Sequence, residues 1–353
     1  MYSLSLIELN DVEMVHYADD QILVYTQFNQ VSIITENNKF SFQLPLPAYL
    51  KAIGKLRLIR RALRIDKCSI GLSRDKKDMV ITYGGYVYHF CLEQRILTRT
   101  SKLRNCNTVL HQSIASLSSN VFIFGEYGRN NARDDIPLYL STDGGRNWKI
   151  QYSFPSGSIR HIHGVYFDKF TGHIWVTTGD LTGECHIFEF KDINLNNPTK
   201  YGDGSQIWRT VGLFFTEDSV VWAMDSEYEV SHLVTMDRRS GKISKGRSFP
   251  GPVWYIKTLV DGLYLLQTTF EKGDGVITDS AHLFVSRNLK DWSEIALFRH
   301  DGMPLRFFKN AVLAFSNGEQ KSNSFYMSAE AIKGMDGKAF KCQITKNKGG
   351  LSG

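Results

Sequence analysis

Three observations on this sequence predict an all-β fold. Of its 353 residues, 42% are hydrophobic and 12% are aromatic, including 16 Tyr and 22 Phe. The apolar runs are short and rich in Val, Ile, Tyr and Phe, the residues that favour strands. Apolar residues seldom recur at helical spacing, so few helices are expected. A chain of this length can also bury a large core.

Pairs of apolar runs recur along the chain, each joined by a turn and most ending in a small or acidic residue. The seven pairs are 15–27, 68–84, 111–126, 161–180, 209–225, 255–271 and 306–316. Their interval of roughly 45 residues is typical of β-propeller blades. The sequence therefore predicts one β-propeller domain, residues 1–353, with seven four-stranded blades; six blades is the alternative.

A second hairpin follows most pairs and would complete a four-stranded blade. The clearest are VSIIT with KFSFQL, YVYHFC with ILTRT, LYLST with WKIQYSF, HLVTM with KISKGRSF, and HLFVS with WSEIALF. After the fourth pair a polar loop, 194–204, leaves the last strand of that blade obscure. The N-terminal run SLSLIEL is expected to join the last blade, because an unpaired blade would expose a strand edge.

Charge and cysteine content exclude several classes of protein. The net charge of +6 suits an acidic substrate or partner, but the basic residues are too dispersed for a nucleic-acid interface. Five cysteines without a CxxC pair argue against a disulfide framework. The N-terminus lacks a basic leader, and no apolar run approaches the roughly 20 residues of a membrane span. We expect a cytoplasmic protein; its oligomeric state is not predicted.

One basic segment interrupts the repeats between the first and second blades. Residues 48–64 place Leu50, Ile53, Leu56 or Leu58, and Leu63 at near-helical spacing, with basic residues between them. Such a helix could lie on an anionic membrane, which would make the protein membrane-associated. The alternative is an insertion whose apolar side packs on the propeller.

Propeller geometry brings the start of each first strand and the end of each second strand to one channel mouth, where ligands bind. Four second strands end in carboxylates, namely Glu126, Asp180, Asp225 and Glu271. The first strands begin with His111, His161 and His163, Arg209, Tyr255 and Arg306. We expect catalysis from the carboxylates, His111 and Tyr255. The alternative is that the acidic residues only cap turns.

Two histidines stand out in the segment RHIHG, residues 160–164. Residues i and i+2 of a strand share a face, so His161 and His163 would project together. Neutral imidazoles ligate Zn, Mn or Fe(II), and His111 could be a third ligand of a Zn or Mn site. Alternatively, one histidine bonds a carboxylate while the other fills the core, and His111 acts as a general base.

Other residues could contact the substrate. Arg209 and Arg306 could grip a substrate carboxylate in bidentate fashion, or could instead pair with Asp225 or Glu271. Trp254 offers a face for sugar stacking, although propeller tryptophans often fill blades. Tyr127 and Arg129 follow Glu126 on the same loop. No GxSxG, P-loop or dinucleotide motif is present.

The segment LYLSTDGGRNWKI contains Ser141, Asp143, Gly145 and Trp148 in the order S-x-D-x-G-x-x-W. This pattern resembles the Asp-box, or BNR repeat, of sialidase-like β-propellers. SRNLKDW, residues 286–292, looks like a version shortened by one residue. The resemblance implies a turn between the third and fourth strands of a blade. The F/Y-R-I-P motif of sialidases is missing, so a typical sialidase is not expected.

Residues 56–316 also resemble poorly characterised propeller proteins of bacterial exopolysaccharide and capsule gene clusters. RLIRRALR, FGEYGRN, IRHIHGVYFD, IWVTTGD and GPVWY carry this resemblance. RHIHG with His111 is similar in character to the metal site of propeller polysaccharide lyases. The resemblance implies a carbohydrate-active enzyme that cleaves an acidic glycan, either as a glycoside hydrolase or as a metal-assisted lyase. The alternative is a non-catalytic propeller that binds glycan or protein during polysaccharide assembly.

Overall fold

The fold is that of a seven-bladed β-propeller, made of seven four-stranded antiparallel sheets. The computed structural model describes residues 2–321 and 323–346. These described residues divide into two compact units: unit one lies within the ranges 1–64, 227–233 and 245–353, and unit two within 65–226 and 234–244. The predicted number and size of the blades are confirmed.

Four sheets follow one another from the first to the fourth repeat. Their strands are β2 Met14–Ala18, β3 Ile22–Gln27, β4 Gln30–Thr35 and β5 Lys39–Gln43; β6 Cys68–Leu72, β7 Asp78–Tyr83, β8 Tyr86–Cys91 and β9 Ile96–Lys102; β10 Ala115–Ser116, β11 Phe122–Gly125, β12 Ile136–Ser141 and β13 Lys149–Phe154; β14 His161–Phe167, β15 Ile174–Gly179, β16 Cys185–Phe190 and β17 Thr199–Gly204. The strand that the sequence left obscure is β17.

Three further sheets complete the repeats. Their strands are β18 Phe214–Phe215, β19 Ser219–Ala223, β20 Ser231–Asp237 and β21 Ile243–Phe249; β22 Val253–Thr258, β23 Tyr264–Thr268, β24 Ser280–Ser286 and β25 Trp292–Arg299; β26 Val312–Phe315, β27 Ser324–Glu330, β28 Lys338–Lys346 and β1 Tyr2–Glu8. A 3-10 helix, η1, spans Gln206–Trp208.

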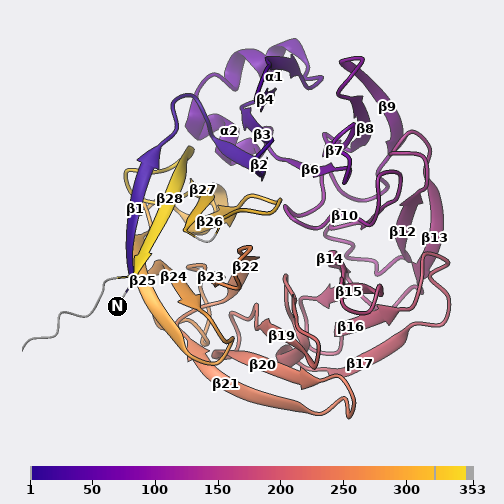
Figure 1. The fold of residues 1–353 in the computed structure, drawn as a ribbon, viewed down its shortest axis with the longest axis vertical. Helices are drawn as coiled ribbons and strands as arrows, with labels where there is room; N and C mark the ends of the chain where they lie inside the picture. Colours follow the sequence, from indigo (N-terminus) through magenta and orange to yellow (C-terminus); the bar gives the residue numbers. More distant parts are fainter. Residues whose placement is uncertain (1, 322, 347–353) are drawn as a thin grey trace, which may run out of the picture. The chain divides into compact units, whose positions relative to one another are not determined.

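The N-terminal strand completes the last sheet, as the sequence predicted. β1 pairs with β28 from Tyr2–Lys346 to Glu8–Phe340, and Figure 1 shows the indigo β1 beside the yellow β28. The seventh repeat is nevertheless placed differently from the prediction. Residues 306–316 contain helix α3, Leu305–Phe308, and only one strand, β26. Arg306 lies in that helix and does not begin a strand.

The turn between β12 and β13 is held by its own polar residues, as its pattern predicted. Asp143 Oδ1 accepts hydrogen bonds from the backbone N–H groups of Arg146, at 3.1 Å, and Asn147, at 2.9 Å. Ser141 Oγ accepts one from Gly145, whose φ of 94° suits glycine. Trp148 packs edge-on against Phe124 with ring centroids 4.9 Å apart. The turn thereby fixes the register of this hairpin.

In the insertion between the first two sheets, leucines are exposed and arginines are buried, which is the reverse of an apolar side packed on the propeller. The insertion forms two short helices, α1 Ala48–Ile53 and α2 Arg57–Leu63. Leu56, Leu58 and Leu63 are exposed, whereas Arg60 and Arg61 are buried. The prediction that the apolar side packs on the propeller is therefore wrong. Among the described residues no helix is long and apolar enough to cross a membrane.

The five cysteines are free, in agreement with the sequence, which argued against a disulfide framework. Apolar side chains of adjacent strands form the cores of the sheets. In unit two one such cluster joins Phe154, Val165, Val176 and Phe190. These rigid sheets position the residues at the strand ends.

Candidate functional site

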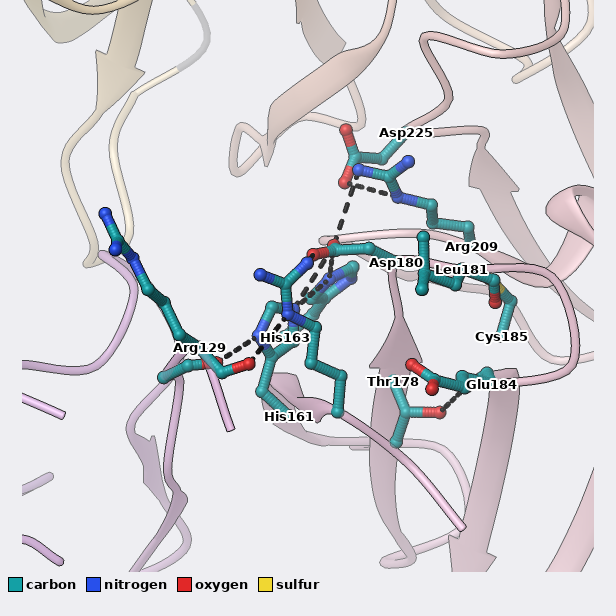
Figure 2. A network of polar contacts seen from close by, with 12 residues as sticks. Arg129, His161, His163, Thr178, Asp180, Leu181, Glu184, Cys185, Arg209 and Asp225 are labelled. Atoms are coloured by element: carbon teal, nitrogen blue, oxygen red, sulfur yellow. Dashed lines mark hydrogen bonds and ion pairs between the residues drawn. The ribbon is translucent and has the colours of Figure 1, made fainter. Parts of the chain in front are cut away.

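Two histidines and an aspartate converge in unit two, at one end of β14 and β15 (Figure 2). His161 begins β14, and Asp180 directly follows β15. The pairing of these strands shifts between Ile162 and Gly164, so His163 is the extra residue of a bulge. Bulges re-aim side chains, and this one directs both imidazoles at the same carboxylate.

The three polar groups meet at nearly equal distances. Asp180 Oδ1 lies 3.2 Å from His161 Nε2 and 3.1 Å from His163 Nε2. The two Nε2 atoms are 3.2 Å apart. Both histidines are buried. In the part of the chain that the structure describes, these residues form the group suited to holding a metal ion, with ligand atoms within 4.8 Å of one another.

Backbone contacts set the tautomer of both histidines. His161 Nδ1 lies 2.8 Å from the carbonyl oxygen of Gly128, and His163 Nδ1 lies 3.0 Å from that of Thr210. Because a carbonyl oxygen only accepts, each Nδ1 carries the hydrogen and donates it. In a neutral imidazole Nε2 then holds a lone pair. Two nitrogen lone pairs and a carboxylate oxygen therefore face one another, an arrangement that a cation stabilises.

The spacing of the ligand atoms also suits a metal ion. A tetrahedral zinc ion with bonds of about 2.0–2.2 Å separates its ligand atoms by about 3.3 Å. The observed separations of 3.1 to 3.2 Å are close to that value. Two imidazoles and one carboxylate form a common ligand set of catalytic zinc and non-haem iron.

Two arginines surround the carboxylate of Asp180. Arg160 Nη1 lies 2.9 Å from Asp180 Oδ2, and Arg209 Nη2 lies 3.4 Å from Oδ1. Arg209 also reaches Asp225, with Nε 3.5 Å from Oδ2, as the dashed lines in Figure 2 show. Asp180 is thus oriented through both oxygens, as metal-binding carboxylates commonly are.

The backbone around Asp180 is held in place on both sides. Thr178 Oγ1 donates to the carbonyl oxygen of Glu184 at 2.8 Å, which closes the loop that follows Asp180. The preceding residue, Gly179, leaves room for its neighbours, since a Cβ there would lie 2.9 Å from Cε1 of His163 and 3.2 Å from Cγ of Arg209. The site is preorganised by rigid elements.

Burial and hydrogen bonding shift the ionisation of two of the three groups. Burial alone would raise the pKa of Asp180, but its close contacts with His161 and His163 outweigh that effect and hold the pKa well below its usual range. Burial lowers the pKa of His163, although the neighbouring carboxylate of Asp180 opposes this by favouring the protonated ring. The carboxylate is therefore ionised and His163 is neutral, the forms that ligate metal.

The predicted residues of the third blade have different surroundings. His111 lies in a turn before β10 and is not a member of the His161–His163–Asp180 group, so the third member of that group is Asp180 and not the predicted His111. Glu126 is buried and accepts hydrogen bonds from Tyr139 and from two backbone N–H groups.

The loop after Glu126 reaches the site with one of its two predicted residues. Tyr127 packs against His161, with ring centroids 4.2 Å apart. Arg129 is exposed, and Figure 2 shows its guanidinium directed away from Asp180. Its backbone carbonyl instead accepts a hydrogen bond from Arg160 Nε at 3.0 Å.

The remaining predicted residues, Glu271, Tyr255, Trp254 and Arg306, belong to unit one. Tyr255 packs against the core of its unit, and Trp254 is the extra residue of a bulge in β22. Matching the strand pairings of β22 and β14 aligns Phe270, rather than Glu271, with Asp180. The predicted equivalence of Glu271 is therefore off by one residue. Arg306 is exposed on α3, with its guanidinium 5.6 Å from the ring of Phe307.

Sequence reasoning missed Arg160, which precedes β14 and holds Asp180. Its signal was its place in the RHIHG segment, immediately before the two histidines. The carbonyl groups that orient the imidazoles come from Gly128 and Thr210, and no side-chain pattern could have indicated them.

Comparison with known proteins identifies the fold and no family. No family model matches the chain, and no curated protein matches it. Two solved structures share the fold at a TM-score of 0.58. The one described as "Structure of U3-55K" is 8% identical, over 97% of this chain and 98% of that one. A chain of the "Crystal Structure of Mitotic Checkpoint Complex" is 9% identical, over 97% of this chain and 89% of that one.

Proposed function

We propose that the protein binds a divalent metal ion, zinc or manganese, through His161, His163 and Asp180, and cleaves an acidic glycan by β-elimination. The observation that carries the proposal is the triangle of Nε2, Nε2 and Oδ1 atoms, each turned toward the other two. The tautomers set by backbone carbonyls leave no imidazole hydrogen inside this triangle when both rings are neutral.

The surroundings of the triangle support an anionic sugar as substrate. Arg160 and Arg209 add positive charge beside Asp180, and the chain as a whole carries a net charge of +6. A bound metal ion would supply Lewis-acid stabilisation to the carboxylate of a uronic acid. Positive charge at that point favours loss of the proton on the adjacent carbon.

The proposed elimination needs one base and no further reactant. The base takes the proton from the carbon next to the carboxylate, and the bond from the neighbouring carbon to the glycosidic oxygen breaks. A carbon–carbon double bond forms between these two carbons, and the base passes the proton that it removed to the leaving oxygen. We assign the base to Tyr127, since its ring lies against His161.

The hydrolytic alternative has weaker support. It requires two free carboxyl groups on either side of the scissile bond. Glu126 is engaged by three structural donors, and Asp180 and Asp225 are held by arginines. Because these three carboxylates already have donors or arginines as partners, they are better suited to balancing charge than to acting as general acids.

The turn at Ser141–Trp148 supports a proposed relationship to sialidase-like propellers and, with it, a role in bacterial exopolysaccharide or capsule metabolism. Its hydrogen bonds are those expected of an Asp-box. The second candidate function is a non-catalytic propeller that binds glycan or protein. One structural neighbour comes from a multi-protein complex, which favours that candidate.

Metal binding is tested by measuring zinc and manganese affinity by calorimetry on the purified full chain. We expect one bound ion, and loss of binding in His161→Met. The matched control is His173→Gln, which removes another histidine paired with a carboxylate, Glu189, and leaves affinity unchanged. If wild type binds neither metal, or if His161→Met binds as tightly, the metal site is wrong.

Cleavage is tested separately with a panel of acidic oligosaccharides. Elimination gives an unsaturated product that absorbs ultraviolet light, whereas hydrolysis gives new reducing ends without that absorbance. Tyr127→Phe should lower kcat about 100-fold or more with metal affinity unchanged. Metal binding without any product across the panel would overturn the enzymatic proposal in favour of the binding candidate.

A further inference from the structure

The helices α1 and α2 expose apolar side chains that a packed insertion would bury. Tyr49 on α1 is 68% exposed, and no residue of α1 is buried. Leu56 is 63% exposed, and Leu58 and Leu63 on α2 are each 50% exposed. Exposed apolar groups of this size mark interaction surfaces when they occur together.

The buried side of α2 is polar and is attached by ion pairs. Arg60 pairs with Glu13, and Arg61 pairs with Asp301 and with Asp336, the latter at 3.3 Å. Arg57 contacts Asp336 at 3.2 Å. Three arginines thus meet three carboxylates within unit one. This attachment holds α2 with its leucines directed outward.

Helix α3 adjoins α2 and adds to the same exposed group. Arg61 Nε donates to the carbonyl oxygen of Phe308, and the guanidinium lies 5.7 Å from the Phe308 ring. Its neighbours Arg306 and Phe307 are exposed. We use the name outer helical face for a set of exposed residues on the three helices and directly beside them; they are Tyr49, Lys51, Ile53, Lys55, Leu56, Leu58, Leu63, Arg64, Arg306 and Phe307.

The charge of this face is entirely positive. Between Glu36 and Asp66 the sequence contains no acidic residue. Lys51 on α1, Lys55 between the two helices, Arg64 directly after α2 and Arg306 on α3 have no ion pair with a carboxylate among the residues described. The arginines that do have partners are those turned inward.

We propose that the outer helical face binds the surface of an anionic lipid bilayer. Helices that lie in a membrane interface combine leucine and aromatic side chains with lysine and arginine. Protein interfaces, by contrast, are depleted in lysine at their centres. With α1 and α2 only six and seven residues long, the insertion is shallow and leaves the folded unit outside the bilayer. The inference does not depend on the proposed glycan chemistry.

Vesicle sedimentation of the full chain tests this proposal. We expect binding to vesicles of phosphatidylcholine with phosphatidylglycerol and much weaker binding to pure phosphatidylcholine. Binding should weaken with added salt, because screening shortens the range of the attraction. The double variant Lys51→Ala, Lys55→Ala should bind about 30-fold more weakly, because it removes the attraction of two basic side chains to the anionic membrane surface.

A second double variant, Leu56→Gln, Leu63→Gln, tests the apolar part and should bind at least about 10-fold more weakly. The matched control is Val260→Gln, Ile277→Gln, which changes two equally exposed apolar residues of unit one, 66% and 73% exposed, outside the face. All variants should melt near wild type. Absence of binding to anionic vesicles, or variants that bind like wild type, would overturn the proposal. Self-association that needs the leucines, without vesicle binding, would instead assign the face to a protein interface.

Discussion

The first and fourth blades place a bulged histidine at the same position and surround it differently. In both β2 and β14 the pairing with the next strand shifts at the third residue, which is a histidine. The matched positions hold Met14, His16 and Gln27 in the first blade, and His161, His163 and Asp180 in the fourth. One repeat thus gives a packing residue and the other a cluster of candidate metal ligands.

The neighbours of the histidine account for the difference. His16 is buried, with Nε2 3.0 Å from Oγ1 of Thr26. The position of Thr26 is Gly179 in the fourth blade, where no side chain intervenes between His163 and Asp180. A bulged histidine therefore becomes a candidate ligand only when glycine, a second imidazole and a carboxylate accompany it.

The largest expected difference between the two blades concerns the carboxylate. Asp180→Ala should destabilise the protein by about 3 kcal/mol, because the arginines around it lose a partly buried counter-charge. This loss of stability is at the low end of the range for broken buried ion pairs, because Arg209 still has Asp225 as an ion-pair partner. Denaturant unfolding with a metal chelator present measures the difference. Gln27→Ala, at the matched exposed position, should change stability by less than about 0.5 kcal/mol. Equal effects of the two variants would contradict the comparison.

The sequence predicted the repeats because each depends on local pattern. Short β-rich runs and the Ser141–Trp148 turn determine strands and hairpins through contacts between near neighbours. Strand alternation also predicted that His161 and His163 share a target. The bulge that re-aims His163 could not be predicted, because it depends on how β14 pairs with β15. For the same reason the sequence did not indicate that Asp180, rather than His111, lies beside the two histidines.

The insertion shows where pattern reasoning fails. The spacing of leucines predicted an apolar contact, yet the partners of α2 are Glu13, Asp301 and Asp336. These carboxylates are distant in sequence from the arginines that they bind. Only the folded arrangement brings them together, so the side of the helix that faces inward was not readable from 48–64 alone.

A third bulged strand, β22 of the sixth blade, contains a buried lysine with different partners. Lys257 Nζ donates to the carbonyl oxygens of Ser316, at 2.7 Å, and Gly318, at 3.0 Å. Burial lowers its pKa to about 7. Above that pH the unfolded chain, with an ordinary lysine pKa near 10.4, binds the proton that the folded chain has lost. Stability contributed by this group therefore rises with pH and is lost as pH falls toward 7.

This pH dependence is expected to amount to about 2 kcal/mol between pH 7 and 8.5, from about 1.4 kcal/mol per pH unit. Partial burial raises the pKa of the Cys68 and Cys106 thiols to about 12, so their contribution to stability falls with rising pH, above this range. The unfolding free energies of wild type and Lys257→Met, compared across that window, isolate the lysine. The unfolding free energy of wild type should rise relative to that of the variant as the pH increases. If the two free energies change in parallel with pH, Lys257 keeps its proton. The ionisation of Lys257 is set by burial, whereas the charge of Asp180 is balanced by neighbouring arginines.

The smallest expected effect concerns the glycine that distinguishes the fourth blade. Gly179→Ala adds a Cβ 2.9 Å from Cε1 of His163, so the imidazole must move although its Nδ1 is held by Thr210. We expect a loss of about 1 kcal/mol of stability, typical of mild overpacking. Because the ring is displaced, zinc affinity should fall about 10-fold, as when an orienting contact is lost. Thr26→Ala, at the matched position of the first blade, should cost a similar amount through the lost contact with His16 and leave zinc affinity unchanged. If the two variants affect zinc binding equally, the glycine is not what makes the fourth blade distinct.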